Sequence, residues 1–372
     1  MTAQKIRRIA INTGGGDAPG LNAVIRAVVL SAKRRDWEVI GIQRGYAGLL
    51  DTSKIVNLDY HHVRGITHLG GTIIGTSNKG NPFEMPVKLP DGTETLMDRS
   101  DEVVTNFERL GLDALIAIGG DGSMKIAHKF AKKGLPIVGV PKTIDNDLEG
   151  TVVTFGFDTA MTVATDAVDR LHSTAEAHER VFTVEVMGRY AGWIALSAAI
   201  AGGADVALIP EIPYDIDIVC RKLMSREARG RRFGLVVVAE GSKPIGGEMV
   251  TKGDKELGRE IHLGGIAEIV AHQITEKMDK ETRTVVLGHL QRGGKPTPRD
   301  RALALSFGAA AVRVIAAEEF GVMVALDPPE VKTVPLSEAI GRRKTVPLDS
   351  DIVCTAREIG ICLGDDWEYA RY

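Results

Sequence analysis

The sequence is poor in cysteine, in secretory signals and in long apolar stretches. Its 372 residues include only Cys220, Cys354 and Cys362, too few and too scattered for a disulfide framework or a thiolate metal site. No stretch approaches the roughly 18 apolar residues that a membrane span requires. Residues 1–8 are polar and basic, and no signal peptide is visible. We therefore expect a cytoplasmic protein with reduced cysteines.

An excess of positive charge is also missing. The formal net charge is −3, so nothing favours nucleic acid or an anionic membrane as a partner. Aromatic residues make up only 5% of the chain, whereas glycine is plentiful. This composition favours closely packed parallel α/β layers over a β-sandwich. The length suggests about two domains.

Short apolar runs alternate with amphipathic segments along the chain. Residues 21–34 predict a helix, because Leu21, Ile25, Val28 and Val29 share one face. Strands separated by such helices predict βαβ units and parallel sheets. We expect an α/β protein of two Rossmann-like domains, with helices on both faces of parallel-rich sheets and the active site in the interdomain cleft.

The expected elements are placed by these patterns. We expect residues 79–104 to form a surface excursion. We expect the tail from about residue 340 to be irregular. The predicted strands are 6–11, 38–42, 114–118, 137–140, 183–187, 206–209, 235–239 and 284–287, and the predicted long helices are 158–177, 266–278 and 301–318.

Three loops follow predicted strands and carry glycine or carboxylates. The first, residues 14–20, matches the dinucleotide fingerprint poorly because Pro19 replaces its third glycine, and no Walker A motif occurs. Its backbone N–H groups could approach a phosphate closely. The alternative is a tight turn with no ligand.

The second loop, residues 119–123, precedes a predicted helix at 123–133. Its glycines let phosphate lie against the main chain, and Asp121 suits Mg²⁺, which prefers carboxylate and phosphate oxygens. Ser123 is expected to cap the helix. The alternative is a sharp turn in which Asp121 only caps.

The third loop, residues 141–147, contains two aspartates. In an extended segment Asp145 and Asp147 share a face, with Asn146 opposite. One carboxylate could take the proton of a substrate hydroxyl while the other holds a metal or orients the first. Lys142 could counter phosphate charge. The alternative is a turn with solvated acids. Together the three loops predict phosphoryl transfer.

Further loops supply arginines that suit phosphate recognition through their planar fork. Arg189 stands beside Gly188, and residues 282–294 contain Arg283, His289 and Arg292. The whole set resembles the 6-phosphofructokinase family. The motifs that carry the resemblance are 15–23, 70–72, 119–123, 143–147, Arg180, 187–189, Glu240, Arg283 and 289–294.

The resemblance implies phosphoryl transfer to the 1-hydroxyl of fructose 6-phosphate with Mg²⁺. It makes Asp145 the general base and Asp121 the metal-linked acid, with Thr143, Asp147 and Arg189 also catalytic. The implied donor site comprises Gly15, Lys79, Gly120, Asp121, Gly122, Ser123 and Lys142. The implied sugar-phosphate site comprises Thr143, Asp145, Arg180, Met187, Gly188, Arg189, Glu240, Arg283, His289, Leu290, Gln291 and Arg292.

The resemblance also implies an assembly and a division of the chain. Arg180 and Arg283 would reach the 6-phosphate of a neighbouring subunit, which implies a homodimer or homotetramer. The donor domain is expected at 1–156 plus about 291–341. The sugar-phosphate domain is expected at 157–290 plus about 342–372.

Two positions that carry the resemblance indicate different phosphoryl donors. Gly122 is similar to members that use ATP, because an aspartate there would repel the nucleotide. Lys142 is similar to members that use pyrophosphate. ATP is favoured, with pyrophosphate as the alternative. Two other classes stay open: a nicotinamide-dependent oxidoreductase built on the first loop, and a non-catalytic sugar-phosphate sensor.

Overall fold

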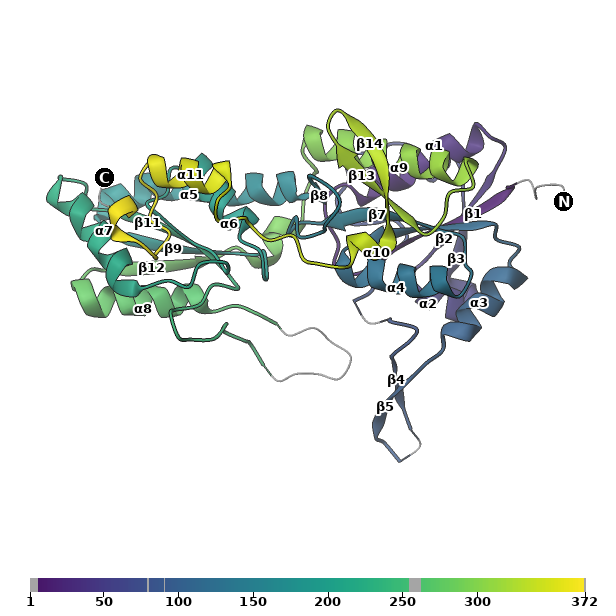
Figure 1. The fold of residues 1–372 in the computed structure, drawn as a ribbon, viewed down its shortest axis with the longest axis horizontal. Helices are drawn as coiled ribbons and strands as arrows, with labels where there is room; N and C mark the ends of the chain where they lie inside the picture. The colour runs from purple at the N-terminus through teal and green to yellow at the C-terminus, as the bar shows by residue number, and fades with distance from the viewer. Residues whose placement is uncertain (1–5, 79, 90, 254–261, 371–372) are drawn as a thin grey trace. The chain divides into compact units, whose positions relative to one another are not determined.

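The structure is a computed structural model that describes residues 6–78, 80–89, 91–253 and 262–370. The chain divides into two compact units, and it passes between them after Asp158, after Gln291 and after Arg343 (Figure 1). The first unit contains the described residues up to Asp158 together with 292–343. Which unit binds which ligand remains a prediction.

The first unit is built on a sheet with parallel strands at its centre. The strand order is β14-β13-β7-β6-β1-β2-β3, with β8 beside β7. The edge strands β3 and β14 run antiparallel to their neighbours. The bounds are β1 (Arg8–Thr13), β2 (Glu38–Ile42), β3 (Ile55–Leu58), β6 (Ala114–Gly119), β7 (Ile137–Thr143), β8 (Phe155–Gly156), β13 (Val322–Asp327) and β14 (Glu330–Pro335).

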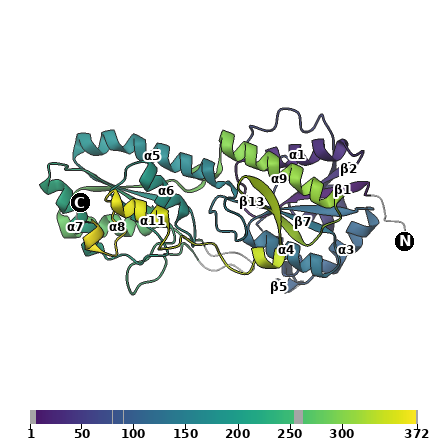
Figure 2. The ribbon, with the colours of Figure 1, turned by 45° about the horizontal axis from the view of Figure 1, so that its top comes forward.

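Helices cover both faces of this sheet because successive side chains of its strands point to opposite sides. Ile9 and Ile11 of β1 pack with α1 and α9, which lie side by side in Figure 2. Ala10, between them in sequence, packs in the core that contains α3 and α4. The bounds are α1 (Leu21–Lys33), α2 (Ala47–Leu50), α3 (Ser100–Arg109), α4 (Asp121–Lys132), α9 (Pro298–Ala316) and α10 (Leu336–Ala339).

The second unit is built on a parallel sheet with the order β10-β11-β9-β12. Val206, Val236 and Val181 of neighbouring strands share one core with α7 and α8, whereas α6 packs on the other side (Figure 1). The bounds are β9 (Val181–Val186), β10 (Val206–Leu208), β11 (Gly234–Ala239), β12 (Thr282–Val286), α5 (Phe157–His178), α6 (Trp193–Ala201), α7 (Ile216–Ala228), α8 (Ile266–Met278), α11 (Asp351–Glu358) and α12 (Trp367–Ala370).

The α/β prediction of parallel-rich sheets with helices on both faces is confirmed. One local expectation was wrong. The tail is not irregular throughout, because α11 and α12 form and Val353 and Ala356 of α11 are buried. The surface excursion expected at 79–104 is confirmed, because β4 (Met85–Lys88) and β5 (Glu94–Met97) form an antiparallel hairpin whose residues are half-buried or exposed. Within the described residues, no helix has the length and hydropathy of a membrane span.

Candidate functional site

The three loops predicted to bind ligand lie at one edge of the first unit's sheet. β1, β6 and β7 are neighbouring parallel strands, so their carboxyl ends meet there. In register, Thr13 lies opposite Ile118, and Gly119 lies opposite Pro141. Open parallel sheets bind their ligands at this edge. It is therefore the candidate site of the first unit.

The first loop is held by hydrogen bonds to two other segments. The Gly14 N–H donates to the Ile118 carbonyl at 2.9 Å, and the Gly15 N–H donates to the Ser77 carbonyl at 3.1 Å. The hydroxyl of Thr76 donates to the Gly15 carbonyl at 2.6 Å. Gly15 has a φ of +75°, which a residue with a Cβ rarely adopts. These two N–H groups therefore hold the loop itself.

Ser123 packs the first loop against the second. A Cβ added to Gly14 would stand 2.7 Å from the Ser123 hydroxyl oxygen, and one added to Gly119 would clash with the same side chain. The expectation that Ser123 caps the helix was wrong. α4 begins at Asp121, and its N-cap is Gly120, which has an extended backbone. Ser123 lies within the first turn, where its small side chain fits between two glycines.

Asp121 begins α4 and faces solvent in part. Its carboxylate accepts a hydrogen bond from the exposed Lys125 at 2.7 Å, one helical turn away. The N–H groups of a first helical turn lack intrahelical partners, and the helix dipole favours anions at this end. A Cβ added to Gly122 would meet no atom within 4 Å. The start of α4 therefore offers an open surface that suits a phosphate.

The two-aspartate loop folds inward rather than into solvent. Asp145 is 5% exposed and Asn146 4% exposed, so the alternative of solvated acids was wrong. The expectation of an extended segment was also wrong, because Asn146 has a φ of +53°. Its side-chain oxygen accepts from the Thr154 N–H at 3.1 Å, and the Thr143 hydroxyl accepts from the Asp145 N–H at 3.0 Å. These bonds hold the backbone of the two-aspartate loop.

Asp147 is electrostatically connected to both Asp121 and Arg343. Burial raises the pKa of Asp147, the Arg343 guanidinium opposes that rise, and the Asp121 carboxylate adds to it. The Arg343 Nε atom lies 3.7 Å from an Asp147 carboxylate oxygen, and Arg343 forms an isolated bridge with Leu148. Sequence reasoning missed Arg343, because no local motif joins it to this loop.

Lys142 and Arg292 both reach carbonyls of the first loop. The Nζ atom of Lys142, a residue only 3% exposed, donates to the Gly16 carbonyl. The Arg292 guanidinium donates to the Asp17 carbonyl at 3.1 Å. Burial, followed by the repulsion of Arg292, lowers the pKa of Lys142 to about 8. A Cβ on Gly16 would clash with Arg292. Two cations thus hold consecutive carbonyls of one loop.

The second unit gathers the other predicted residues at two places. After β9, the Met187 N–H donates to the buried Gln291 side chain at 2.8 Å, and the Arg189 N–H donates to Glu240 at 3.2 Å. Arg189 has a φ of +49° and Gly188 one of +138°, so this turn is sharply bent. Met187, Gly188, Arg189, Glu240 and Gln291 therefore form one cluster at a strand end.

Arg180 and Arg283 converge on one carboxylate. Arg180 donates to Glu281 at 2.6 Å, and Arg283 donates to the other oxygen of the same side chain. β12, which contains Arg283, is an edge strand of its sheet. His289 and Leu290 follow β12 and are exposed. Lys79, predicted to bind the donor, lies outside the described residues.

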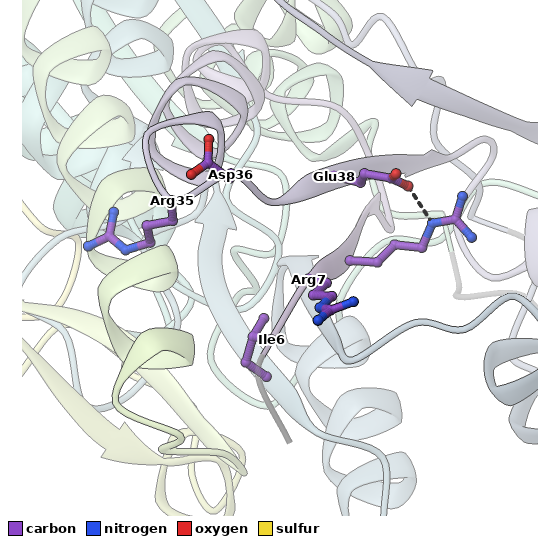
Figure 3. A pocket seen from close by; sticks show the side chains of 6 residues that line it. Ile6, Arg7, Arg35, Asp36 and Glu38 are labelled. Atoms are coloured by element: carbon purple, nitrogen blue, oxygen red, sulfur yellow. Dashed lines mark hydrogen bonds and ion pairs between the residues drawn. The ribbon is translucent and has the colours of Figure 1, made fainter. Parts of the chain in front are cut away.

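The first unit also has a cavity of about 590 Å³ that is distant from these loops in the sheet. Ile6, Arg7, Arg8, Arg35, Asp36 and Glu38 line it (Figure 3). Arg8 and Glu38 begin β1 and β2 and form an ion pair at 2.8 Å. The cavity thus lies at the amino-terminal ends of the strands, opposite the glycine loops. None of the predicted site residues that the structure describes lines it.

Comparison with known proteins identifies one family. A protein-family model described as Phosphofructokinase matches residues 8–315. The chain belongs to the phosphofructokinase family. The family membership predicted from the loops is confirmed. Among relatives, the chain is 52% identical to a protein of Chloroflexus aurantiacus named "ATP-dependent 6-phosphofructokinase", with 98% of this chain and 99% of the relative covered. It is 50% identical to "ATP-dependent 6-phosphofructokinase 1" of Synechocystis, over 97% of this chain and 99% of the relative.

Solved structures of phosphofructokinases have the same fold. The Pichia pastoris phosphofructokinase in the T-state matches 99% of this chain and 38% of its own, with 31% identity and a TM-score of 0.79. The pyrophosphate-dependent phosphofructokinase from Marinobacter aquaeolei matches with 20% identity and a TM-score of 0.77, over 98% of this chain and 91% of its own. At 20% identity, the similarity to the Marinobacter aquaeolei structure shows the fold alone.

Proposed function

We propose that this phosphofructokinase transfers the terminal phosphoryl group of ATP to the 1-hydroxyl of fructose 6-phosphate. The observation that carries the proposal is the meeting of three loops at one sheet edge, with Asp121, Lys142 and Asp145 among their residues. The names of relatives about half identical over nearly the whole chain support ATP as donor. A cytoplasmic location belongs to the same proposal.

Asp145 acts as the general base in this proposal. A base must stand within hydrogen-bond reach of the hydroxyl proton that it removes. The backbone N–H of Asp145 donates to the Thr143 hydroxyl, and the side chain lies in a buried loop at the strand end. Asp147 keeps a second negative charge nearby and is balanced by Arg343. Thr143 and Arg189 complete the proposed catalytic set.

The donor binds beside the first turn of α4. Backbone N–H groups there attract phosphate, and the open space at Gly122 leaves room for a nucleotide. Gly15, Gly120 and Ser123 form the walls of this region. A Cβ on Gly120 would stand 3.4 Å from the Lys142 carbonyl, so the second and third loops are in contact. Lys79 is proposed as a further donor contact.

The residues of the site suit Mg²⁺. Asp121 and Asp147 follow neighbouring strands, and the Asp121 carboxylate adds to the rise that burial causes in the pKa of Asp147. Carboxylate oxygens are ligands that Mg²⁺ prefers. In the part of the chain that the structure describes, no group of three or more His, Cys, Asp or Glu could hold a metal. This donor set fits an ion that binds through one or two carboxylates, water and substrate phosphates. When bound, Mg²⁺ would neutralise phosphate charge.

The sugar phosphate is proposed to bind through residues of the second unit together with Arg292. Arginine suits this role because its fork can donate two parallel bonds to phosphate. Arg180 and Arg283 are proposed to act across a subunit interface in a homodimer or homotetramer. Their common partner Glu281 places both near the edge strand β12. The remaining proposed contacts are Met187, Gly188, Glu240, His289, Leu290 and Gln291.

An assay of the purified chain with fructose 6-phosphate and Mg²⁺ tests the proposal. Formation of fructose 1,6-bisphosphate with ATP is the expected result. Formation with pyrophosphate only would replace ATP by the alternative donor. Absence of product with either donor, despite binding of fructose 6-phosphate, would favour a non-catalytic sensor. Oxidation or reduction of a nicotinamide would favour the oxidoreductase.

A further inference from the structure

Lys142 is buried at the boundary between the first and third loops, although lysine is seldom buried without a partner. It belongs to β7, next to the two-aspartate loop, and its ammonium reaches the Gly16 carbonyl. A Cβ on Gly15 would stand 3.6 Å from the Lys142 Nζ atom and 3.7 Å from the Ser123 hydroxyl. Gly15 is thus enclosed by two side chains from different loops.

We infer that Lys142 is a positioning residue, which fixes the first loop against α4 through the Gly16 carbonyl and so shapes the donor site. The inference rests on the proposed function of that site. Arg292 acts with it, since it holds the next carbonyl of the loop, that of Asp17. A lysine used in this way shapes a site for ATP and does not mark use of pyrophosphate. Gly122 and Lys142 then no longer indicate different phosphoryl donors.

The charges around Lys142 agree with this role. Arg292 repels its ammonium, whereas Asp17, Asp145 and Asp147 attract it. An ammonium in this position is bound to a carbonyl, and the carboxylates offset part of the cost of its burial. A lysine that binds the terminal phosphate of the donor would instead extend toward solvent. The burial of Lys142 at 3% exposure therefore favours anchoring of the loop.

Two substitutions separate anchoring from direct phosphate binding. In Lys142→Gln a neutral N–H donor remains, whereas in Lys142→Met no donor remains on a side chain of similar length. If the lysine anchors the loop, Lys142→Met weakens ATP binding by about tenfold, and Lys142→Gln recovers much of the loss. If the lysine neutralises phosphate, both variants lose affinity equally. Binding of Mg²⁺ and a non-hydrolysable ATP analogue by calorimetry measures this.

Hydrogen exchange in the ligand-free protein gives a readout that needs no substrate. Anchoring predicts faster exchange of the amides of residues 14–18 in Lys142→Met, with less change in Lys142→Gln. Lys132→Met, at an exposed position of α4, is the matched control and should change neither quantity. Gly16→Ala tests the bond from Arg292 to the Asp17 carbonyl, because the added Cβ displaces Arg292. This substitution should also speed exchange of the amides of residues 14–18.

The outcomes distinguish this inference from the proposed function. Unchanged exchange in both Lys142→Met and Gly16→Ala, or equal loss of affinity in the two Lys142 variants, overturns the anchoring role alone. A wild-type protein that binds no ATP analogue overturns the proposed function and the inference with it. In Lys142→Met the KM for ATP should rise, whereas the KM for fructose 6-phosphate should change little.

Discussion

Burial raises the pKa of Asp147, and the carboxylate of Asp121, which comes from a different loop, raises it further. The two residues follow neighbouring strands, β6 and β7, whose carboxyl ends meet. The second and third loops therefore present negative charge to the same region. Arg343 offsets part of this charge from a distant part of the sequence. Such a pair of carboxylates suits a divalent cation bound to phosphate.

Asp145→Ser should lower turnover by roughly 10²–10⁴-fold, because the general base is lost. The affinity for fructose 6-phosphate should change little, since serine keeps a small polar side chain in the buried loop. Steady-state kinetics and a separate binding measurement check the two parts. Asp169→Ser, at an exposed position of α5, is the control. Near-normal turnover in Asp145→Ser would refute the base assignment.

Gly122→Asp should impair the use of ATP far more than any use of pyrophosphate. The structure leaves open space at this position, so the new side chain should not disturb the fold. Its negative charge would instead repel the nucleotide at the start of α4. Values of kcat/KM for the two donors, with a melting temperature as control, measure the effect. Equal losses with both donors would show that position 122 does not select between them.

The stability of Lys142→Met relative to the wild type should depend on pH. Burial lowers the pKa of Lys142 from its usual 10.5 to about 8, so the folded state disfavours the charged lysine. The cost, roughly 3 kcal/mol, is fully present below about pH 8 and fades as the pH rises toward 10.5. The free energy of unfolding of the wild type should therefore rise relative to that of Lys142→Met over this window. Urea denaturation at pH 7 and pH 10 measures it, and a difference independent of pH would contradict the argument.

Asp205→Ala should destabilise the second unit by about 3 kcal/mol. Asp205 is 4% exposed, pairs with Arg226 and accepts a hydrogen bond from the Leu235 N–H at 2.9 Å. Its loss leaves a partly buried guanidinium and a buried N–H without their carboxylate. Glu38→Ala, which breaks the exposed pair with Arg8, should cost less than about 1 kcal/mol. Equal effects in denaturant unfolding would argue against the buried pair.

Much of the fold could be predicted from local patterns. Apolar runs such as 114–118 and 137–140 became β6 and β7, because a strand covered on both faces needs apolar side chains throughout. The site loops followed, since parallel strands bring their carboxyl ends to one edge. The sequence alone therefore predicts that Asp121 and Asp145 lie at the same edge of the sheet.

The rest depended on contacts that no local pattern encodes. Arg343 approaches Asp147 through a bridge to Leu148, and neither sequence segment predicts that pairing. Ser123 looked like a cap because serine favours that position, but the tight approach of Gly14 and Gly119 gives it a packing role. Asn146 has a left-handed backbone, so the segment is not the extended one in which Asp145 and Asp147 would share a face. α11 and α12 are short helices that depend on tertiary packing.

A double-mutant cycle on Asp121 and Asp145 tests the central claim most directly. If both carboxylates serve one transferred phosphoryl group, their effects on kcat are not additive. The account predicts that Asp121→Ser combined with Asp145→Ser costs little more than the worse single substitution. Losses in kcat that simply multiply, with all variants folded, would contradict a shared site.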